Sequence, residues 1–454
     1  MHEWMPPTVR DGHEDPAAMR AGYGNPALHT WWPLTEPEAA ALGNVGKARE
    51  GDPQALLDLA ILASGEPRDA ASYARYAQRV QAFLTEVRPA VDGAADEWHR
   101  GYELNRAMHR LFFHGGSGEL GSYDVNQSRV SGIFDTGRYN CISSAMLFAV
   151  LARGFGMPVR GVQVPTHVFI EMGAPGGKIL EVETTSDTGF DQVHDERFFR
   201  EQGAKWSASR GLRPVTLEDY QHRQILEPVR LMAAGMKNQG GLSKRDEDRS
   251  RLFEAAALVD PDDVESQRLR VEAYAMEAQK LSQQNASRTV VKMFEAVWPA
   301  VADAATKASK DDKTLRFVGW SRWFYASALG ALGRGDEATA LANDGLDSLD
   351  SRWEDAADLR LNDVGVLDDQ MMVLMKSRRY ADATKVMGRH LDACRAVPYC
   401  LSNLEVVYRN WSIDSQNVGD WQTARQALQA CVTQLPGDAT CTHDLSDLEG
   451  RHRF

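Results

Sequence analysis

Residues 139–185 constrain the fold most, because one apolar helical pattern is followed directly by two short strand patterns. From Ile142 the chain is apolar at helical spacing, and Gly154, Gly156 and Pro158 end the helix. Two alternating runs follow, and the connection GAPGGK between them is typical of a hairpin, so the strands should pair antiparallel. The stretch therefore predicts a core helix beside a small sheet.

Three reactive side chains occur in this stretch. Cys141 opens the helix, His167 begins the first strand, and Glu183 ends the second. In that order they can supply a nucleophile, a base and a group that orients the base. A thiol in the first helical turn, with Asn140 as the cap, meets free backbone N–H groups that favour the thiolate and can stabilise an oxyanion.

The supporting groups have more than one candidate. Glu181 and Glu183 lie on the same face of their strand, so either carboxylate could reach His167 across the strand pair. A side-chain amide that completes an oxyanion hole could come from Asn126 or Gln127.

The set resembles the transglutaminase-like superfamily, which has a papain-type cysteine-enzyme core. The resemblance covers about residues 100–230. Its matching motifs are Asn140-Cys141, Gly156-Met157-Pro158-Val159-Arg160, His167-Val168-Phe169-Ile170-Glu171 and Glu183-Thr184-Thr185. The family usually has Asp at the third position, and Glu183 is one methylene longer.

The resemblance implies an α+β fold: a transglutaminase-like, papain-like core with helices before it. It also implies a cysteine-dependent hydrolase or acyl transferase that acts on amide bonds of a peptide or protein through Cys141, His167 and Glu183. Bacterial proteins of this type resemble peptidases, amidases or acyl-transfer enzymes. Protein crosslinking is not implied, since the extra domains of calcium-dependent animal transglutaminases are not evident. The alternative is an inactive transglutaminase-like fold that serves as a protein–protein interaction scaffold.

The chain divides by composition into three parts. Residues 1–35 are rich in Pro, Gly and His and predict an extended arm, anchored by Trp31 and Trp32. Residues 36–240 contain a helical prelude and the core, and residues 241–454 predict an all-α region.

The last region contains a weak repeat. Residues 333–346, 377–391 and 418–432 align on Ala338, Ala383 and Ala424, at offsets of 45 and 41 residues. A small residue at a helix crossing lets two helices approach, so the pattern resembles tetratricopeptide-type repeats whose groove could bind a protein partner. The alternative is a non-repeating helical bundle.

Charge and motif content narrow the function classes. The net charge of −13 argues against nucleic-acid binding, because phosphates require a basic face. No apolar run approaches the roughly 20 residues of a membrane span. CxxC, HExxH and G-x-x-x-x-G-K motifs are absent from the sequence, so we expect no metal and no cofactor.

The remaining four cysteines lie near the C-terminus. Cys394 and Cys400 bracket one predicted helix junction, and Cys431 and Cys441 bracket another. Each pair could form a disulfide, which would leave Cys141 as the free thiol. Disulfides would indicate a periplasmic or other extracytoplasmic location, with a signal peptide missing from this sequence. Reduced cysteines would indicate the cytoplasm.

Overall fold

The computed structural model describes residues 28, 30–114, 122–191, 196–209, 213–307, 312–349 and 356–452. The described residues up to Arg270 form one compact unit, and those from Val271 form a second. Most of the arm predicted for residues 1–35 lies outside the described residues. No helix in the described ranges is both long and apolar enough to span a membrane.

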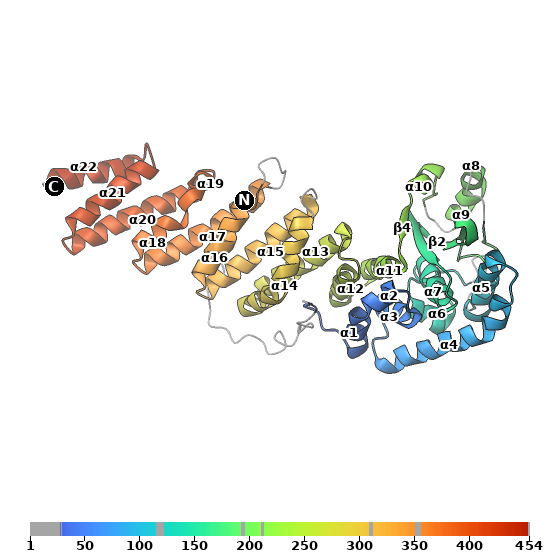
Figure 1. Cartoon of the computed structure of the whole chain (residues 1–454). Coiled ribbons are helices and arrows are strands. Elements are labelled where there is room, and N and C mark those ends of the chain that lie inside the picture. The colour runs from blue at the N-terminus through green and yellow to red at the C-terminus, as the bar shows by residue number, and fades with distance from the viewer. Residues whose placement is uncertain are drawn as a thin grey trace. The chain divides into compact units, whose positions relative to one another are not determined.

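The first unit combines helices with four short strands (Figure 1). Its elements are α1 (Glu36–Gly43), α2 (Val45–Arg49), α3 (Pro53–Ala63), α4 (Ala70–Asp92), α5 (Glu97–Phe112), α6 (Val130–Thr136), α7 (Cys141–Gly154), β1 (Val159–Val164), β2 (His167–Gly173), η2 (Pro175–Gly177), β3 (Ile179–Val182), α8 (Glu196–Phe198), η3 (Phe199–Gly203), α9 (Ala204–Ser209), α10 (Leu217–Gln221), β4 (Gln224–Leu226), α11 (Pro228–Leu242) and α12 (Asp246–Val259).

The second unit is helical throughout its described residues (Figure 1). Its elements are α13 (Val264–Gln283), which begins in the first unit, α14 (Ser287–Lys307), α15 (Asp312–Ala331), α16 (Gly335–Ser348), α17 (Ala356–Lys376), α18 (Tyr380–Val386), η4 (Gly388–His390), α19 (Leu391–Arg395), α20 (Pro398–Asn417), α21 (Trp421–Gln434) and α22 (Ala439–Arg451).

The four strands form one antiparallel sheet in the order β3-β2-β1-β4. Ile170 pairs with Val182 across β2 and β3, which confirms the predicted hairpin around GAPGGK. The α+β fold class is also confirmed. The edge strand β4 was not predicted, because three residues are too short for an alternating pattern to be recognised.

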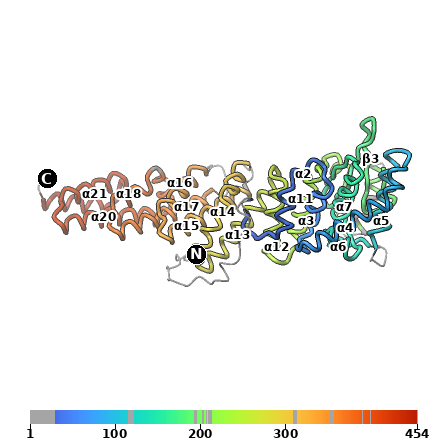
Figure 2. The backbone as a smooth tube through the Cα atoms, turned by 60° about the horizontal axis from the view of Figure 1, so that its bottom comes forward, coloured from blue at the N-terminus to red at the C-terminus, as the bar shows by residue number. Residues whose placement is uncertain are grey.

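Helix α7 is the centre of the first unit. Residues 145–152 have no exposed surface, because β1, β2, α3, α5 and α11 pack against the helix. Figure 2 shows α7 among the other elements of the first unit. A helix that is apolar on all sides must be buried in this way. This burial fixes the position of its first residue, Cys141.

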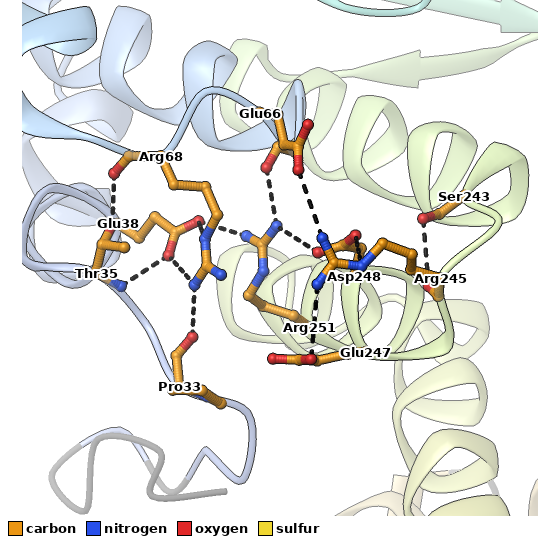
Figure 3. Close-up of polar contacts among 11 residues, drawn as sticks. Pro33, Thr35, Glu38, Glu66, Arg68, Ser243, Arg245, Glu247, Asp248 and Arg251 are labelled. Atoms are coloured by element: carbon orange, nitrogen blue, oxygen red, sulfur yellow. Dashed lines mark hydrogen bonds and ion pairs between the residues drawn. The ribbon is translucent and has the colours of Figure 1, made fainter. Parts of the chain in front are cut away.

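A buried ion-pair network joins α1 to α12 within the first unit (Figure 3). Glu38 of α1 pairs with Arg251 of α12, and both side chains are 1% exposed. Arg68 pairs with the same carboxylate at 2.8 Å. Arg251 also donates to the Gly65 carbonyl at 2.9 Å. Helix α12 therefore packs in the first unit, which extends beyond residue 240.

Trp31 and Trp32 attach the chain to the same helix. Both indole side chains are buried. Their backbone N–H groups donate to the carboxylate of Glu254 in α12, at 2.7 and 3.3 Å. The two tryptophans therefore anchor the segment that precedes α1.

Several helix pairs of the second unit share the same type of turn at the end of their first helix. In four of these pairs, a residue in the left-handed conformation stands two positions before the second helix. These residues are Asn285 before α14, Gly333 before α16, Arg378 before α18 and Gly419 before α21. The N–H of the next residue then donates to the carbonyl five positions earlier, in the pairs Ala286–Leu281, Arg334–Leu329, Arg379–Leu374 and Asp420–Ser415. This is the Schellman type of helix end. The helical C-terminal region is thus consistent with the predicted repeats.

The three alanines that define the sequence repeat occupy equivalent places. Ala338, Ala383 and Ala424 lie in α16, α18 and α21, and each has no exposed surface. Each follows its left-handed turn residue by five positions. A buried small side chain at this point allows the second helix of each pair to pack closely on its neighbours.

The C-terminal cysteines form two disulfides. Cys394 is joined to Cys400 between α19 and α20, and Cys431 to Cys441 between α21 and α22. The Cα–Cα separations of 5.5 and 6.1 Å lie in the usual range for a disulfide. Cys141 is the free cysteine.

Candidate active site

Cys141 is the first residue of α7, and it is partly exposed. Asn140 caps the helix: its Oδ1 accepts from the Ser143 N–H at 3.0 Å, and its own N–H donates to Ser143 Oγ at 2.9 Å. The Asn140 Nδ2 group donates to the Val125 carbonyl at 3.0 Å and to Ser128 Oγ at 2.9 Å. The predicted cap therefore fixes both the helix start and the preceding loop.

The first turn of α7 also offers hydrogen-bond donors beside the thiol. Asn140 accepts from the N–H groups of Ser143 and Ser144. Within the described part of the chain, the N–H groups of Cys141 and Ile142 have no such acceptor. Both lie at the positive end of the helix, where backbone donors can stabilise a developing negative charge.

His167 is the first residue of β2 and is 9% exposed. Its Nε2 lies 2.6 Å from Glu183 Oε2. Its interaction with Cys141 is among the causes that raise the pKa of the imidazole. The structure thus brings together the three side chains that the sequence singled out.

The turn before His167 has an unusual backbone. Thr166 has φ = 66°, a left-handed conformation that β-branched residues rarely adopt. Val164 and His167 pair across this turn, and Thr166 Oγ1 donates to the Arg213 carbonyl at 3.1 Å. This hydrogen bond ties the turn to the segment that leads to α10.

Glu183 lies one residue beyond the end of β3. Its Oε2 forms a hydrogen bond with His167 Nε2. Its Oε1 accepts hydrogen bonds from the N–H and the hydroxyl of Thr185, at 3.1 and 2.6 Å. Both carboxylate oxygens therefore have partners, so the side chain is held in one orientation.

The electrostatics of this pair favour charges on both groups. Burial lowers the pKa of His167, but the charge of Glu183 and the hydrogen bonds with Cys141 and Glu183 outweigh it and raise the pKa to about 10. Burial raises the pKa of Glu183, but His167 and the Thr185 hydrogen bonds outweigh it and lower the pKa to about 2. At neutral pH the pair is an imidazolium and a carboxylate.

Glu181, the other predicted carboxylate, has a different partner. The hydroxyl of Tyr220 in α10 donates to Glu181 Oε1. The two glutamates share one face of the strand, yet only Glu183 reaches His167 in the described part of the chain. The strand register explains the choice, because Glu181 pairs with Glu171, four residues along β2 from His167, whereas Glu183 continues β3 toward His167.

The two candidate oxyanion amides lie in the loop before α6. Asn126 is exposed, and its N–H donates to Asp124 at 3.1 Å. The Gln127 side chain is buried against Gly132 and accepts weakly from Arg129. The Gln127 carbonyl accepts from Ser143 Oγ at 2.8 Å. Gln127 therefore supports the start of α7 through its backbone, and no described contact joins either amide to Cys141.

The sequence did not point to the Ser144 hydroxyl, which links α7 to the segment that contains Glu183. Ser144 Oγ lies 2.8 Å from Thr184 Oγ1, and Thr184 is fully buried. Ser144 follows Cys141 by one helical turn, so it faces the same side of α7. That spacing is the signal that could have identified it.

Comparison with known proteins bears on the same part of the chain. Residues 74–229 match the family model described as the transglutaminase-like superfamily. The chain contains a transglutaminase-like domain. This domain extends from α4 to the start of α11 and includes all four strands, Cys141, His167 and Glu183. A search of curated proteins found no match. Domains of this superfamily typically carry out cysteine-based catalysis.

Proposed function

We propose that the transglutaminase-like domain is a cysteine-dependent hydrolase or acyl transferase that acts on amide bonds of a peptide or protein. The observation that carries this proposal is the pairing of His167 with Glu183 at 2.6 Å, together with the interaction of His167 with Cys141 at the start of α7. A thiol, an imidazole and a carboxylate in this order supply a nucleophile, a proton carrier and a group that holds the ring.

The acylation step uses the imidazolium of His167 as the proton donor. The Cys141 thiolate attacks the amide carbonyl carbon, and a C–S bond forms while the carbonyl electrons move to oxygen. The N–H groups of Cys141 and Ile142 stabilise this oxyanion. The His167 imidazolium then gives its proton to the amide nitrogen as the C–N bond breaks. The products are a thioester on Cys141 and a free amine.

Deacylation reverses the proton transfer. His167, now neutral, takes a proton from water or from a second amine, which attacks the thioester carbonyl. The C–S bond breaks, and the thiolate and imidazolium return. Water gives a carboxylic acid, and an amine gives a new amide. Glu183 remains ionised throughout and orients the His167 ring.

The experiment that tests this proposal is acylation by p-nitrophenyl acetate. We expect a burst of p-nitrophenol and an acetyl group on Cys141, detected by mass spectrometry of the intact protein and then of its peptides. Cys141→Ala should give neither. Addition of glycine methyl ester should divert the acetyl group to the amine if the enzyme is a transferase. If no acetyl-Cys141 forms, the inactive scaffold becomes the better account.

The helical second unit is proposed to bind the protein partner or substrate. A pocket of about 510 Å³ lies between α16, α17 and α18, and polar side chains such as Gln370, Arg379 and Lys385 line it. Substitutions Arg379→Ala and Lys385→Ala should raise the KM for a protein substrate such as casein. They should leave acylation by p-nitrophenyl acetate unchanged. An unchanged KM for casein would argue against this role.

A further inference from the structure

Three successive backbone carbonyls beside Glu183 each accept a hydrogen bond from a side chain. His109 Nε2 lies 3.1 Å from the Thr184 carbonyl, so this nitrogen carries the proton. The Tyr139 hydroxyl donates to the Thr185 carbonyl at 3.1 Å. Asn105 Nδ2 donates to the Ser186 carbonyl at 2.8 Å.

The three donors belong to a rigid part of the fold. Asn105 and His109 are one helical turn apart on α5, so they face the same segment. Tyr139 precedes the cap of α7, and its ring stacks on Phe113 with centroids 3.8 Å apart. His109 packs edge-on against Phe113, with centroids 4.6 Å apart. This packing holds the rings of His109 and Tyr139 against Phe113.

Asn105 is fully buried, and its Oδ1 has no hydrogen-bond partner among the described residues. Leaving a buried polar atom unpaired costs stability, and a leucine of similar size would avoid that cost. The amide is therefore better explained by what its Nδ2 group holds than by packing of the core.

We propose that Asn105, His109 and Tyr139 are positioning residues that fix Glu183 against His167. This inference rests on the proposed function, because it assigns a role toward the same carboxylate. The three donors do not touch the reacting atoms. They hold the backbone of residues 184–186, and Thr185 in turn donates to Glu183 Oε1.

The consequence is a dependence of the His167 charge on α5. The carboxylate can keep the imidazolium stable only while it stays at hydrogen-bond distance from Nε2. If residues 184–186 lose their donors, Glu183 samples other orientations and the attraction weakens. The triad then depends on a helix that precedes Cys141 in the sequence and contributes none of the three reactive side chains.

The test uses the full chain and three variants that each remove one donor: Asn105→Leu, His109→Leu and Tyr139→Phe. The pKa of His167 is followed by NMR of the imidazole Cε1–H, with His167→Ala used for assignment. We expect the His167 pKa to fall in each variant. The kcat with p-nitrophenyl acetate should fall about two- to tenfold, as expected for one lost hydrogen bond, and KM should not change.

Two matched variants separate positioning from general damage. His109→Gln keeps an N–H at a similar reach, so it should retain the wild-type His167 pKa. Tyr102→Phe changes a half-buried tyrosine on the same helix and should also retain it. Far-UV circular dichroism checks that each variant is folded. If His109→Leu does not fold, Tyr139→Phe still provides the test. If the His167 pKa and the kcat are those of the wild type in all three donor variants, the inference is overturned.

The outcomes also distinguish this inference from the proposed function. If the wild type forms no acetyl-Cys141 but the His167 pKa falls in the donor variants, the catalytic proposal fails and the positioning role stands. If acylation occurs and the donor variants leave both quantities unchanged, the positioning role fails alone.

Discussion

At the scale of single residues, the site depends on how a glutamate occupies a place where the superfamily usually has an aspartate. Glu183 lies one residue beyond the end of β3, and its Oε2 lies 2.6 Å from His167 Nε2. The Thr185 hydroxyl donates a hydrogen bond to the other carboxylate oxygen, Oε1. The Glu183 side chain is therefore held through both of its carboxylate oxygens.

The charge on His167 should depend on Glu183. In Glu183→Gln the carboxylate charge is lost, and burial then dominates, so we expect the His167 pKa to fall far below about 10. An NMR titration of the imidazole measures it. Glu181→Gln is the matched control, since Glu181 contacts Tyr220, and its His167 pKa should be unchanged. A His167 pKa that stays near 10 in Glu183→Gln would contradict this account.

The same pair should make stability depend on pH. The raised pKa of His167 contributes stability that is complete below about 6.5 and is lost as pH rises through about 10. The lowered pKa of Glu183 contributes stability that is complete above about 4.5 and is lost as pH falls through about 2. The difference in unfolding free energy between wild type and Glu183→Gln, from urea denaturation, should therefore be largest between about pH 4.5 and 6.5. A difference that does not vary with pH would count against the pair.

The residue types of the site could be predicted from the sequence, but not all of their partners. Cys141 and His167 stand at the start of elements with clear patterns, so their roles could be proposed. The choice between Glu181 and Glu183 needed the register of β2 against β3, which the sequence of these two strands does not define. Asn105 and His109 lie on a helix whose pattern shows only which face is apolar, not which loop it meets.

At the scale of elements, the second unit is organised by one repeated helix end. Asn285, Gly333, Arg378 and Gly419 each adopt the left-handed conformation before the second helix of a pair. Only two of them are glycines, so a search for Gly could not find all four. The buried alanines were the clearer signal, because a small side chain at a helix crossing cannot be replaced by a larger one without displacing the partner.

Enlarging one of these alanines should destabilise the second unit. Ala338 of α16 packs beside Gly330 of α15 and has no exposed surface. Ala338→Leu should lower the unfolding free energy of this unit by about 1–3 kcal/mol, as overpacking does in other proteins. Thermal denaturation measures it. Ala340→Leu, on the exposed face of the same helix, should have little effect. Equal effects of the two substitutions would refute the packing role of Ala338.

At the scale of the whole molecule, the chain forms two compact units, and the first extends to Arg270. The sequence predicts that the core ends near residue 240, because almost no strand pattern follows that point. The pairing of Glu38 with Arg251 joins residues 213 positions apart. A single sequence contains no local pattern that reveals such a pair, so the position of α12 could not be predicted.

The disulfides should affect the second unit alone. In native protein purified without reductant, the reagent DTNB should titrate one thiol, that of Cys141, since the other four cysteines are paired. Reduction should destabilise the unit that contains α19–α22 by about 2 kcal/mol for each bond. Calorimetry should show that the transition of the first unit is unchanged. Five reactive thiols in the native protein would contradict the pairing.

The central claim is that Cys141 is a nucleophile that acts together with His167 and Glu183. Its most direct test is the rate of alkylation of Cys141 by iodoacetamide as a function of pH, in wild type and in His167→Ala. We predict rapid alkylation of the wild type at neutral pH and a much slower rate in His167→Ala. Equally slow alkylation of both proteins, with the same pH dependence, would contradict the claim.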